Sequence, residues 1–400
     1  MRLTLEVSTV AHGGVCVARH EGRVVFVRHA LPGEKIVAEI AEPNPDARLW
    51  RAEAIDILEA SPERVRTPWP DAGPGGVGGG ELGHVRHAWQ REWKRRVITE
   101  SFARFADYTF EGQVASVPGD DDRAGVRYRT RVRATATPQG SAGMHRYRSH
   151  EVLPLTSMPL AGENLEKELL KGAFPPHSTI AMAGSEDGAI RIQVNGTPWR
   201  AGRPDRRDNA PRTITEQVTH KGHLYRYRVG VEAFWQVHRG APEVLVSEVF
   251  RRVEGAQRVL DLYAGVGLFS VPLAAHGIQV TSVESAPTAI RYARRNLHDH
   301  PHATVIHHDV RDFLRTSTPK ADVAIVDPPR SGAGAATLEA LVACGIPAIV
   351  YVACDPVALA RDARTLARHG YAMNDVKAWD MFPMTHHVET IATFTREASV

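Results

Sequence analysis

The last third of the sequence alternates short apolar runs with helical stretches, and this pattern constrains the fold more than any other feature. Helical stretches such as 287–300 and 356–370 separate the runs. The apolar runs are 259–262 (VLDL), 280–283 (VTSV), 304–306 (TVI), 323–326 (VAIV) and 348–353 (AIVYVA). Continuous apolar strands that alternate with helices predict a parallel, doubly wound α/β sheet.

A residue with useful chemistry follows each of these five runs. Ligands of doubly wound sheets bind just beyond the carboxyl ends of the strands. In chain order, the residues at those ends are Asp261 to Gly267, Glu284, Asp309, Asp327 and Cys354. The sequence therefore predicts a ligand site at this edge of the sheet.

The first run leads into a glycine turn with the sequence LDLYAGVGLFS (260–270). Gly265 and Gly267 would let a ligand approach the backbone at the start of a helix. Glu284 follows at the distance where a carboxylate can grip ribose hydroxyls. The pattern fits a dinucleotide or S-adenosylmethionine, and Ser270 in place of a third glycine disfavours NAD. The alternative is a tight turn with a structural role only.

The fourth run ends in DPPRSG (327–332). Tandem proline stiffens a loop and cannot continue a strand. Asp327 would then stand on a rigid wall that presents polar groups to a planar base. An ordinary strand exit is the competing interpretation.

The chain has three cysteines, Cys16, Cys344 and Cys354, which form no disulfide framework and show no metal-ligand spacing. They fit a reducing cytoplasm. Cys354 precedes Asp355-Pro356 at an expected helix start, where a thiolate would be stabilised. A lone cysteine is more often a small buried apolar residue, and that interpretation is kept for Cys16 and Cys344.

The first 205 residues differ in character from the rest. Short strands with turn signals over 1–60 predict a small β-barrel of the oligonucleotide-binding type. A stretch rich in proline and glycine follows over 61–80 and is expected to be a linker. Residues 87–106 predict a helix, and a mixed, basic segment continues to about residue 205.

Basic charge is concentrated in the middle of the chain. Residues 84–150 contain 13 Lys and Arg against 7 Asp and Glu, and residues 191–239 contain 10 against 4. Arginines alternate with other residues in 225–229 and in 126–135, and the second stretch would place four on one face of a strand: Arg127, Arg129, Arg131 and Arg133. Such a row suits a polyphosphate backbone, although a solvated sheet face is the alternative for either stretch alone.

The chain resembles the S-adenosylmethionine-dependent RNA uracil-5-methyltransferases over nearly its whole length. The motifs that carry this resemblance are FWQVH (234–238), LDLYAGVGLFS (260–270), DPPRSG (327–332), CDPVALARD (354–362) and HHVETIATF (386–394). The resemblance implies a Rossmann-like class I methyltransferase domain, an N-terminal TRAM-type barrel and a central α+β RNA-binding domain. The expected boundaries are 1–60 for the barrel, 61–80 for the linker, 81–205 for the central domain and 206–400 for the methyltransferase domain.

The resemblance also implies roles for individual residues. Cys354 matches a nucleophile that attacks C6 of uracil, and Glu389 matches the base that removes the C5 proton. From the residues alone, Glu389 could equally be a surface carboxylate at a strand start. Positions that match cofactor contacts, with Asp327 also a candidate to face the uracil, are Gln236, Tyr263, Glu284, Asp309 and Asp327.

Three departures from the family pattern stand out. Asp355 replaces the usual asparagine after the nucleophile and adds negative charge beside it. Leu268 replaces an asparagine in the glycine turn. Residues 77–94 lack the cysteines that hold an iron–sulfur cluster in many relatives, so no cluster and no other metal is predicted, and His84 and His87 are not expected to be ligands.

The leading hypothesis is methyl transfer from S-adenosylmethionine to C5 of a uridine in structured rRNA or tRNA. The alternatives are an NAD-dependent oxidoreductase and a non-catalytic RNA-binding protein or chaperone of the same fold. No apolar run is long enough to span a membrane and no secretory signal is visible, so a cytoplasmic location is expected. A monomer is expected.

Overall fold

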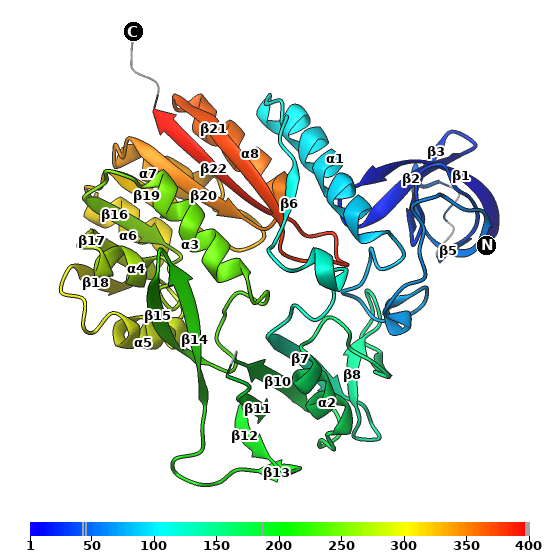
Figure 1. Ribbon diagram of the computed structural model, residues 1–400. Helices are drawn as coiled ribbons and strands as arrows, with labels where there is room; N and C mark the ends of the chain where they lie inside the picture. Colours follow the sequence, from blue (N-terminus) through cyan, green and yellow to red (C-terminus); the bar gives the residue numbers. More distant parts are fainter. Residues whose placement is uncertain (42–43, 45, 186, 397–400) are drawn as a thin grey trace.

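The computed structural model describes residues 1–41, 44, 46–185 and 187–396. These residues form a closed barrel, a seven-stranded sheet, a two-stranded ribbon and an eight-stranded sheet (Figure 1). In Figure 1 the barrel (dark blue) and the eight-stranded sheet lie at opposite sides, with the seven-stranded sheet below and between them. No helix in the described part of the chain is both long and apolar enough to cross a bilayer.

The N-terminal barrel has the strand order β1-β2-β3-β5-β4. Alternate residues of its strands point inward and are buried, among them Leu5, Val7, Cys16 and Val25. The small β-barrel expected from the sequence is therefore confirmed, and Cys16 is a buried residue of its wall. The strands are β1 (Arg2–Ala11), β2 (Val15–His20), β3 (Arg23–Arg28), β4 (Lys35–Ile40) and β5 (Leu49–Glu59).

The segment after the barrel, expected to be a linker, contains one short 3-10 helix, η1 (Pro70–Ala72). Trp69 is only 2% exposed, and its indole N–H donates to the carbonyl of Ser157 at 3.0 Å. A buried tryptophan that is hydrogen-bonded to the central region fixes this segment in place. The segment is thus an ordered connection that packs on the seven-stranded sheet.

The central region is a seven-stranded antiparallel sheet with one helix, α2 (Glu163–Lys171). Its strand order is β13-β12-β11-β10-β7-β8-β9. The strands are β7 (Arg131–Ala136), β8 (Ala142–His145), β9 (Val152–Pro154), β10 (Thr179–Gly184), β11 (Ile190–Val194), β12 (Thr197–Arg200) and β13 (Arg203–Pro204). The α+β character expected for this region is confirmed.

The arginine row expected in this region is wrong. Strand β7 begins only at Arg131, and Arg127 precedes it with a φ of 62°. The Arg131 guanidinium is 8% exposed and pairs with Glu216 at 2.9 Å. Burial against the neighbouring ribbon therefore gives Arg131 a structural partner, and the four arginines do not form one exposed strand face.

A two-stranded ribbon, β14 (Thr213–His220) and β15 (His223–Gly230), leads into the C-terminal half. Tyr225 and Tyr227 on β15 are buried, whereas Arg226 and Arg228 between them are exposed. The alternating arginines expected over 225–229 are therefore on one exposed face.

The eight-stranded sheet has the order β18-β17-β16-β19-β20-β22-β21-β6. Five consecutive strands, from β18 at one edge to β20, run parallel, which confirms the predicted doubly wound sheet. The strands are β16 (Arg258–Leu262), β17 (Gln279–Glu284), β18 (Ala303–His307), β19 (Val323–Val326), β20 (Ala348–Ala353), β21 (Tyr371–Asp380), β22 (Glu389–Arg396) and β6 (Val114–Ser116).

Helices cover both faces of this sheet, and each face has its own apolar core. Leu245, Leu273 and Tyr292 belong to one core, and Phe313, Leu338 and Leu359 belong to the other. The helices are α3 (Ala241–Arg252), α4 (Ser270–Ala275), α5 (Pro287–Asn296), α6 (Val310–Ser317), α7 (Ala335–Ala343) and α8 (Pro356–Arg368). Cys344 follows α7 and is buried in the second core, as expected.

Helix α1 (His87–Ala106) has the limits predicted from the sequence. It packs against α8, and Ile98 and Phe102 enter the second core of the eight-stranded sheet. Strand β6 then pairs with β21 at the edge of that sheet. Residues 87–116 had been expected in the central domain, and the structure attaches them to the C-terminal sheet.

Candidate active site

The strand ends converge as the sequence predicts. The register of the parallel strands aligns Leu262 of β16 with Val326 of β19, and Val326 with Tyr351 of β20. Tyr263 and Asp327 follow directly at this edge, and Cys354 follows the end of β20. Residues far apart in the chain therefore meet along one edge of the sheet.

The carboxylate of Glu284 is hydrogen-bonded to the backbone of the glycine turn. Gly265 and Gly267 have φ angles of 58° and 94°, a region that favours glycine. The Gly265 N–H donates to Glu284 Oε2 at 2.9 Å, and the Ala286 N–H donates to Oε1 at 2.6 Å. Apart from Gly265 itself and its two chain neighbours, no atom of the residues that the structure describes lies within 4 Å of where a Cβ of Gly265 would stand, so a ligand can approach the backbone there.

Ser270, at the place of a third glycine, has a structural task. Its hydroxyl lies 2.5 Å from Asp261 Oδ2 and 2.6 Å from the Ser282 hydroxyl. All three residues are fully buried. Burial raises the pKa of Asp261 to about 7, although the hydrogen bond from Ser270 opposes this. The serine therefore links β16, α4 and β17 beneath the turn.

A cavity opens above the glycine turn. Tyr263, Gly265 and Asp327 line it, together with Gln236 from the loop before α3. The structure thus brings Gln236, which only the family resemblance had selected, to the same place as the glycine turn. Leu268 also lines the cavity, so this departure from the family pattern places an apolar side chain on its wall.

Phe234 lines the same cavity and is 69% exposed. An exposed aromatic ring at the mouth of a cavity is suited to stacking on a nucleobase. Phe234 belongs to the FWQVH motif, and no pattern in the sequence indicates a role for it. Its exposure, which only the fold shows, is the signal that singles it out.

Asp309, which was expected to contact the cofactor, is the N-cap residue of helix α6. Its Oδ1 accepts the N–H of Asp312 at 3.0 Å at the start of α6. Asp309 does not line the cavity, although it is close enough to Tyr263 to contribute to the raised pKa of that phenol, whose main cause is burial. A cofactor contact by Asp309 remains a prediction.

Cys354 and Glu389 lie beside each other at the end of β20. The antiparallel register pairs Ala353 of β20 with Thr390 of β22, so the next residues on the two strands are Cys354 and Glu389. Glu389 is 3% exposed, and burial, with a further contribution from Asp327, raises its pKa well above the ordinary value. A carboxylate with a raised pKa is the stronger base once it is ionised, so Glu389 has to lose its own proton before it can accept one from a substrate.

Burial also raises the pKa of the half-buried Cys354 thiol to about 12, and the Glu389 and Asp327 carboxyls add to the effect. The expectation that the helix start lowers this pKa is therefore wrong for the free site. Desolvation and neighbouring carboxylates outweigh the dipole of α8. Arg330 is the nearby cation that acts in the opposite direction.

The loop of Asp327 is anchored to α8 by Asp362. Asp362 Oδ2 accepts the Ala333 N–H at 2.8 Å and the Tyr351 hydroxyl at 2.5 Å. Gly332 has a φ of 85°, and a Cβ there would lie 2.7 Å from the same oxygen. The last residue of the CDPVALARD motif therefore fixes the proline loop.

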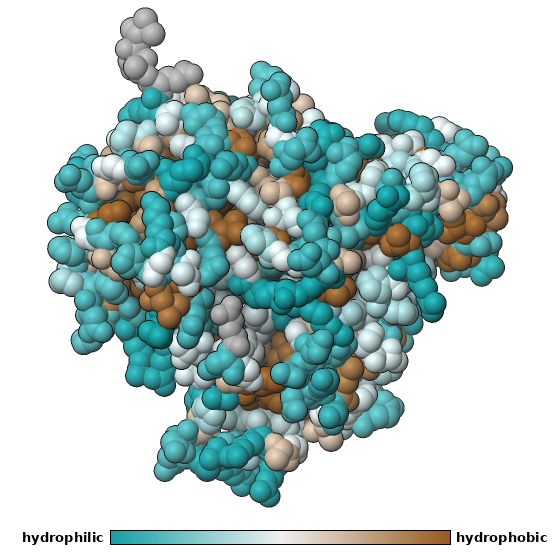
Figure 2. Space-filling model, viewed as in Figure 1, coloured by the Kyte–Doolittle hydropathy of each residue, from teal (hydrophilic) through white to brown (hydrophobic). Residues whose placement is uncertain are grey.

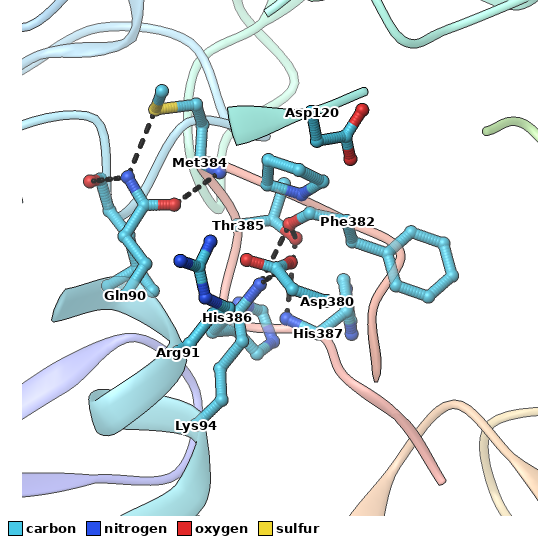
Figure 3. A network of polar contacts seen from close by, with 12 residues as sticks. Gln90, Arg91, Lys94, Asp120, Asp380, Phe382, Met384, Thr385, His386 and His387 are labelled. Carbon is cyan, nitrogen blue, oxygen red and sulfur yellow. Dashed lines mark hydrogen bonds and ion pairs between the residues drawn. The ribbon is translucent and has the colours of Figure 1, made fainter. Parts of the chain in front are cut away.

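The segment that leads into Glu389 is held by α1 (Figure 3). Lys94 Nζ lies 2.5 Å from Asp380 Oδ1 and donates to the Phe382 carbonyl at 3.0 Å. Both charged side chains are at most 1% exposed. Removing either partner of such a buried ion pair destabilises the fold strongly, because it leaves the other charge buried without a partner. Lys94 thus fixes the path of the chain between β21 and β22.

Gln90, one turn earlier on α1, holds the same segment. Its Oε1 accepts the Met384 N–H at 2.8 Å, and its Nε2 donates to the carbonyls of Leu82 and Val85 (Figure 3). This hydrogen-bond network therefore includes residues of the segment 77–94. In many relatives this segment carries the cysteines of an iron–sulfur cluster. In the described residues, no group of three or more His, Cys, Asp or Glu side chains is arranged to hold a metal ion.

A Rossmann-like sheet with a glycine turn beside a mostly apolar cavity, together with an N-terminal barrel, is typical of class I methyltransferases with a nucleic-acid-binding module. Comparison with known proteins narrows this class. Residues 208–397 match the family model described as tRNA (Uracil-5-)-methyltransferase, and residues 2–46 match the TRAM domain.

Similar proteins cover nearly the whole chain. A protein of Bifidobacterium longum named as an uncharacterized RNA methyltransferase is 37% identical over 99% of this chain and 97% of its own. A 23S rRNA (uracil(1939)-C(5))-methyltransferase of Shewanella sediminis is 28% identical over 98% of this chain and 96% of its own. The chain therefore belongs to the RNA uracil-5-methyltransferase family, which confirms the resemblance and the enzyme class.

A solved structure shares the fold. The tRNA (uracil-54, C5)-methyltransferase of Pyrococcus abyssi, in complex with S-adenosyl-L-homocysteine, superposes with a TM-score of 0.72 at 23% identity. The match covers 99% of this chain and 100% of that one. The arrangement of barrel, central sheet and catalytic sheet is thus that of a known architecture.

Proposed function

We propose that this protein transfers a methyl group from S-adenosylmethionine to C5 of a uridine in structured rRNA or tRNA, through a transient bond between Cys354 Sγ and C6. The observation that carries the proposal is the adjacency of Cys354 and Glu389, fixed by the β20–β22 register beside Asp327. Family membership favours methyl transfer over the oxidoreductase alternative.

The residues around the glycine turn fit this cofactor. Backbone and open space at Gly265 suit close approach of a ligand, and Glu284 and Gln236 offer polar groups for ribose or methionine atoms. Burial raises the pKa of Asp327 to about 7, and a cationic ligand nearby would favour its ionised form. S-adenosylmethionine, when bound, supplies an electrophilic methyl group on a cationic sulfonium.

The chemistry follows from the positions of the thiol and the carboxylate. Cys354 loses its proton and adds to C6, which gives C5 the character of an enolate that can accept the methyl group. Glu389 then takes the C5 proton, and the electrons of that C–H bond expel the Cys354 thiolate. Glu389 passes this proton to the expelled thiolate, so the products are 5-methyluridine, S-adenosylhomocysteine and free Cys354, and the proton first lost by Cys354 is released to solvent.

RNA binding requires contacts away from the catalytic edge. The target base has to leave its stack to reach Cys354, and Phe234 offers a ring on which it can rest. Figure 2 shows a hydrophilic surface over the tip of β12 and β13, where four arginines are exposed: Arg200, Arg203, Arg206 and Arg207. We propose this tip and the TRAM barrel as contacts to the RNA backbone, with the protein acting in the cytoplasm as a monomer.

A methylation assay tests the proposal. Total RNA from a strain that lacks the protein is incubated with enzyme and methyl-labelled S-adenosylmethionine, and 5-methyluridine is measured. We expect label in one uridine for the wild type and for the control Cys344→Ala, and none for Cys354→Ala. Equal methylation by wild type and Cys354→Ala would contradict the nucleophile. Absence of methylation by any form, with calorimetry showing that NAD binds and S-adenosylmethionine does not, would overturn the function.

A further inference from the structure

The tip of the β1–β2 hairpin in the barrel contacts the residue that follows the nucleophile. His12 Nε2 lies 2.8 Å from Asp355 Oδ2, although the two residues are 343 positions apart in sequence. The barrel, expected only to bind RNA, therefore reaches the start of helix α8. Both Val357 of α8 and His12 line the cleft between the barrel and the catalytic half.

A glycine makes this close approach possible. Gly14, two residues after His12, has a φ of 72°. A Cβ at this position would lie 2.9 Å from Glu81 Cβ and 3.2 Å from His386 Cβ. The hairpin tip can thus lie directly on the loop that precedes Glu389, and any larger residue would force it away from Asp355.

Asp355 is fixed through both of its oxygens. Oδ1 accepts the N–H groups of Val357 and Ala358 at 3.0 and 2.9 Å, which makes Asp355 the N-cap of α8. Oδ2 is left to pair with His12. An asparagine would keep the cap through its carbonyl oxygen but would bring no charge. The acidic residue at this position is thus matched by a basic partner from another domain.

The ion pair is poorly placed to stabilise the fold. The His12 side chain is 42% exposed and that of Asp355 17% exposed, and pairs of this exposure contribute little to stability. The charge of Asp355, however, lies one residue from a sulfur that has to become a thiolate. A negative neighbour opposes that ionisation, and an imidazole N–H that donates to the same carboxylate draws its charge away from the sulfur.

We propose that His12 is a positioning residue for the nucleophile. Its imidazole donates a hydrogen bond to Asp355 Oδ2 and holds this carboxylate turned away from the sulfur, so that contact between barrel and α8 completes the catalytic site. The proposal rests on the proposed function, in which Cys354 is the nucleophile, and it assigns to the barrel a part in the chemical step.

The test is a double-mutant cycle on adduct formation. Four proteins are compared at saturating RNA that contains 5-fluorouridine: wild type, His12→Ala, Asp355→Asn and the double variant. We expect His12→Ala to slow the covalent step about tenfold, which corresponds to losing one charge-assisted hydrogen bond. Asp355→Asn should be as fast as wild type, and the double variant should match Asp355→Asn. His369→Ala, at the opposite end of α8, is the matched control and should leave the rate unchanged.

Other outcomes overturn the proposal. An unchanged rate in His12→Ala, or a slow double variant, would show that His12 does not act through Asp355. A higher Kd for RNA with an unchanged rate at saturation would make His12 an RNA contact instead. If His12→Ala does not fold, His12→Gln replaces it. The proposal then requires that adding Asp355→Asn restores the rate of adduct formation in this variant as well. Failure of the proposed function is distinct, because the wild type would then form no adduct at all.

Discussion

The two ends of the catalytic edge are built in different ways. At the β16–β17 end, Gly265 is hydrogen-bonded to Glu284, and Ser270 is hydrogen-bonded to Asp261 and Ser282, all within residues 261–284. At the β20–β22 end, Cys354 and Glu389 depend on supports from elsewhere in the chain, among them Lys94 and His12. The cofactor end is thus a local motif, whereas the nucleophile end is assembled by tertiary contacts. Substitutions that affect the nucleophile end should therefore reduce activity or stability more than those at the cofactor end, even when the substituted residue is far from Cys354 in the sequence.

The largest effect is expected at Glu389. Glu389→Gln keeps the shape of the side chain but cannot take the C5 proton, so turnover should fall by about 10²- to 10⁴-fold. The methylated RNA should remain attached to Cys354 and be visible as a slow band on a denaturing gel. The control is Glu339→Gln on α7, which should turn over normally. Normal turnover by Glu389→Gln would remove this residue from the role of base.

Lys94 tests whether the nucleophile end depends on α1. Lys94→Met leaves Asp380 buried without its partner, so the free energy of unfolding should fall by about 3–5 kcal/mol in denaturant titration. Lys377→Met is the matched control, because Lys377 pairs with Glu248 at the surface and its loss should change stability by less than about 1 kcal/mol. Equal effects in the two variants would contradict the claim that the buried Lys94–Asp380 pair supports the nucleophile end.

Ser270 tests the cofactor end. Ser270→Ala removes a buried hydroxyl that contacts Asp261 and Ser282, so stability should fall by about 1–3 kcal/mol. The affinity for S-adenosylmethionine should fall with it, while adduct formation at saturating cofactor should be unchanged. A variant with normal cofactor affinity and a slow covalent step would show that the two ends are not independent.

Asp261 predicts a dependence of stability on pH. Burial raises its pKa in the folded protein from 3.8 to about 7, so the folded state binds more protons than the unfolded state between these values. Stability contributed by this group is therefore present at low pH and is lost as pH rises from about 4 to 7, with a slope of at most about 1.4 kcal/mol per pH unit. Asp261→Asn should flatten the profile of the unfolding free energy by that amount. An unchanged profile would mean that Asp261 is ionised throughout.

The sequence was sufficient for features that depend on local pattern. The runs at 280–283 and 348–353 correspond to β17 and β20 within one residue at each end, and α1 has its predicted limits. Continuous apolar strands and a helical period need no knowledge of tertiary contacts. The strand-end residues followed because parallel strands share one carboxyl edge.

Features that depend on partners from elsewhere in the chain were not predictable. Arg131 was placed on an exposed face because no pattern shows that Glu216 lies beside it. The pKa of Cys354 was expected to fall, since its helix start is local whereas the carboxylates of Glu389 and Asp327 come from other strands. The pairing of His12 with Asp355 likewise has no signal within either segment.

The most direct measurement is mass spectrometry of the protein after reaction with S-adenosylmethionine and RNA that contains 5-fluorouridine. The fluorine at C5 cannot leave as a proton does, so the covalent species should persist. We predict a proteolytic peptide in which Cys354 carries a methylated fluorouridine nucleotide. A wild-type enzyme that methylates ordinary uridine in the same RNA, yet yields only unmodified Cys354 with the fluorinated substrate, would contradict the account.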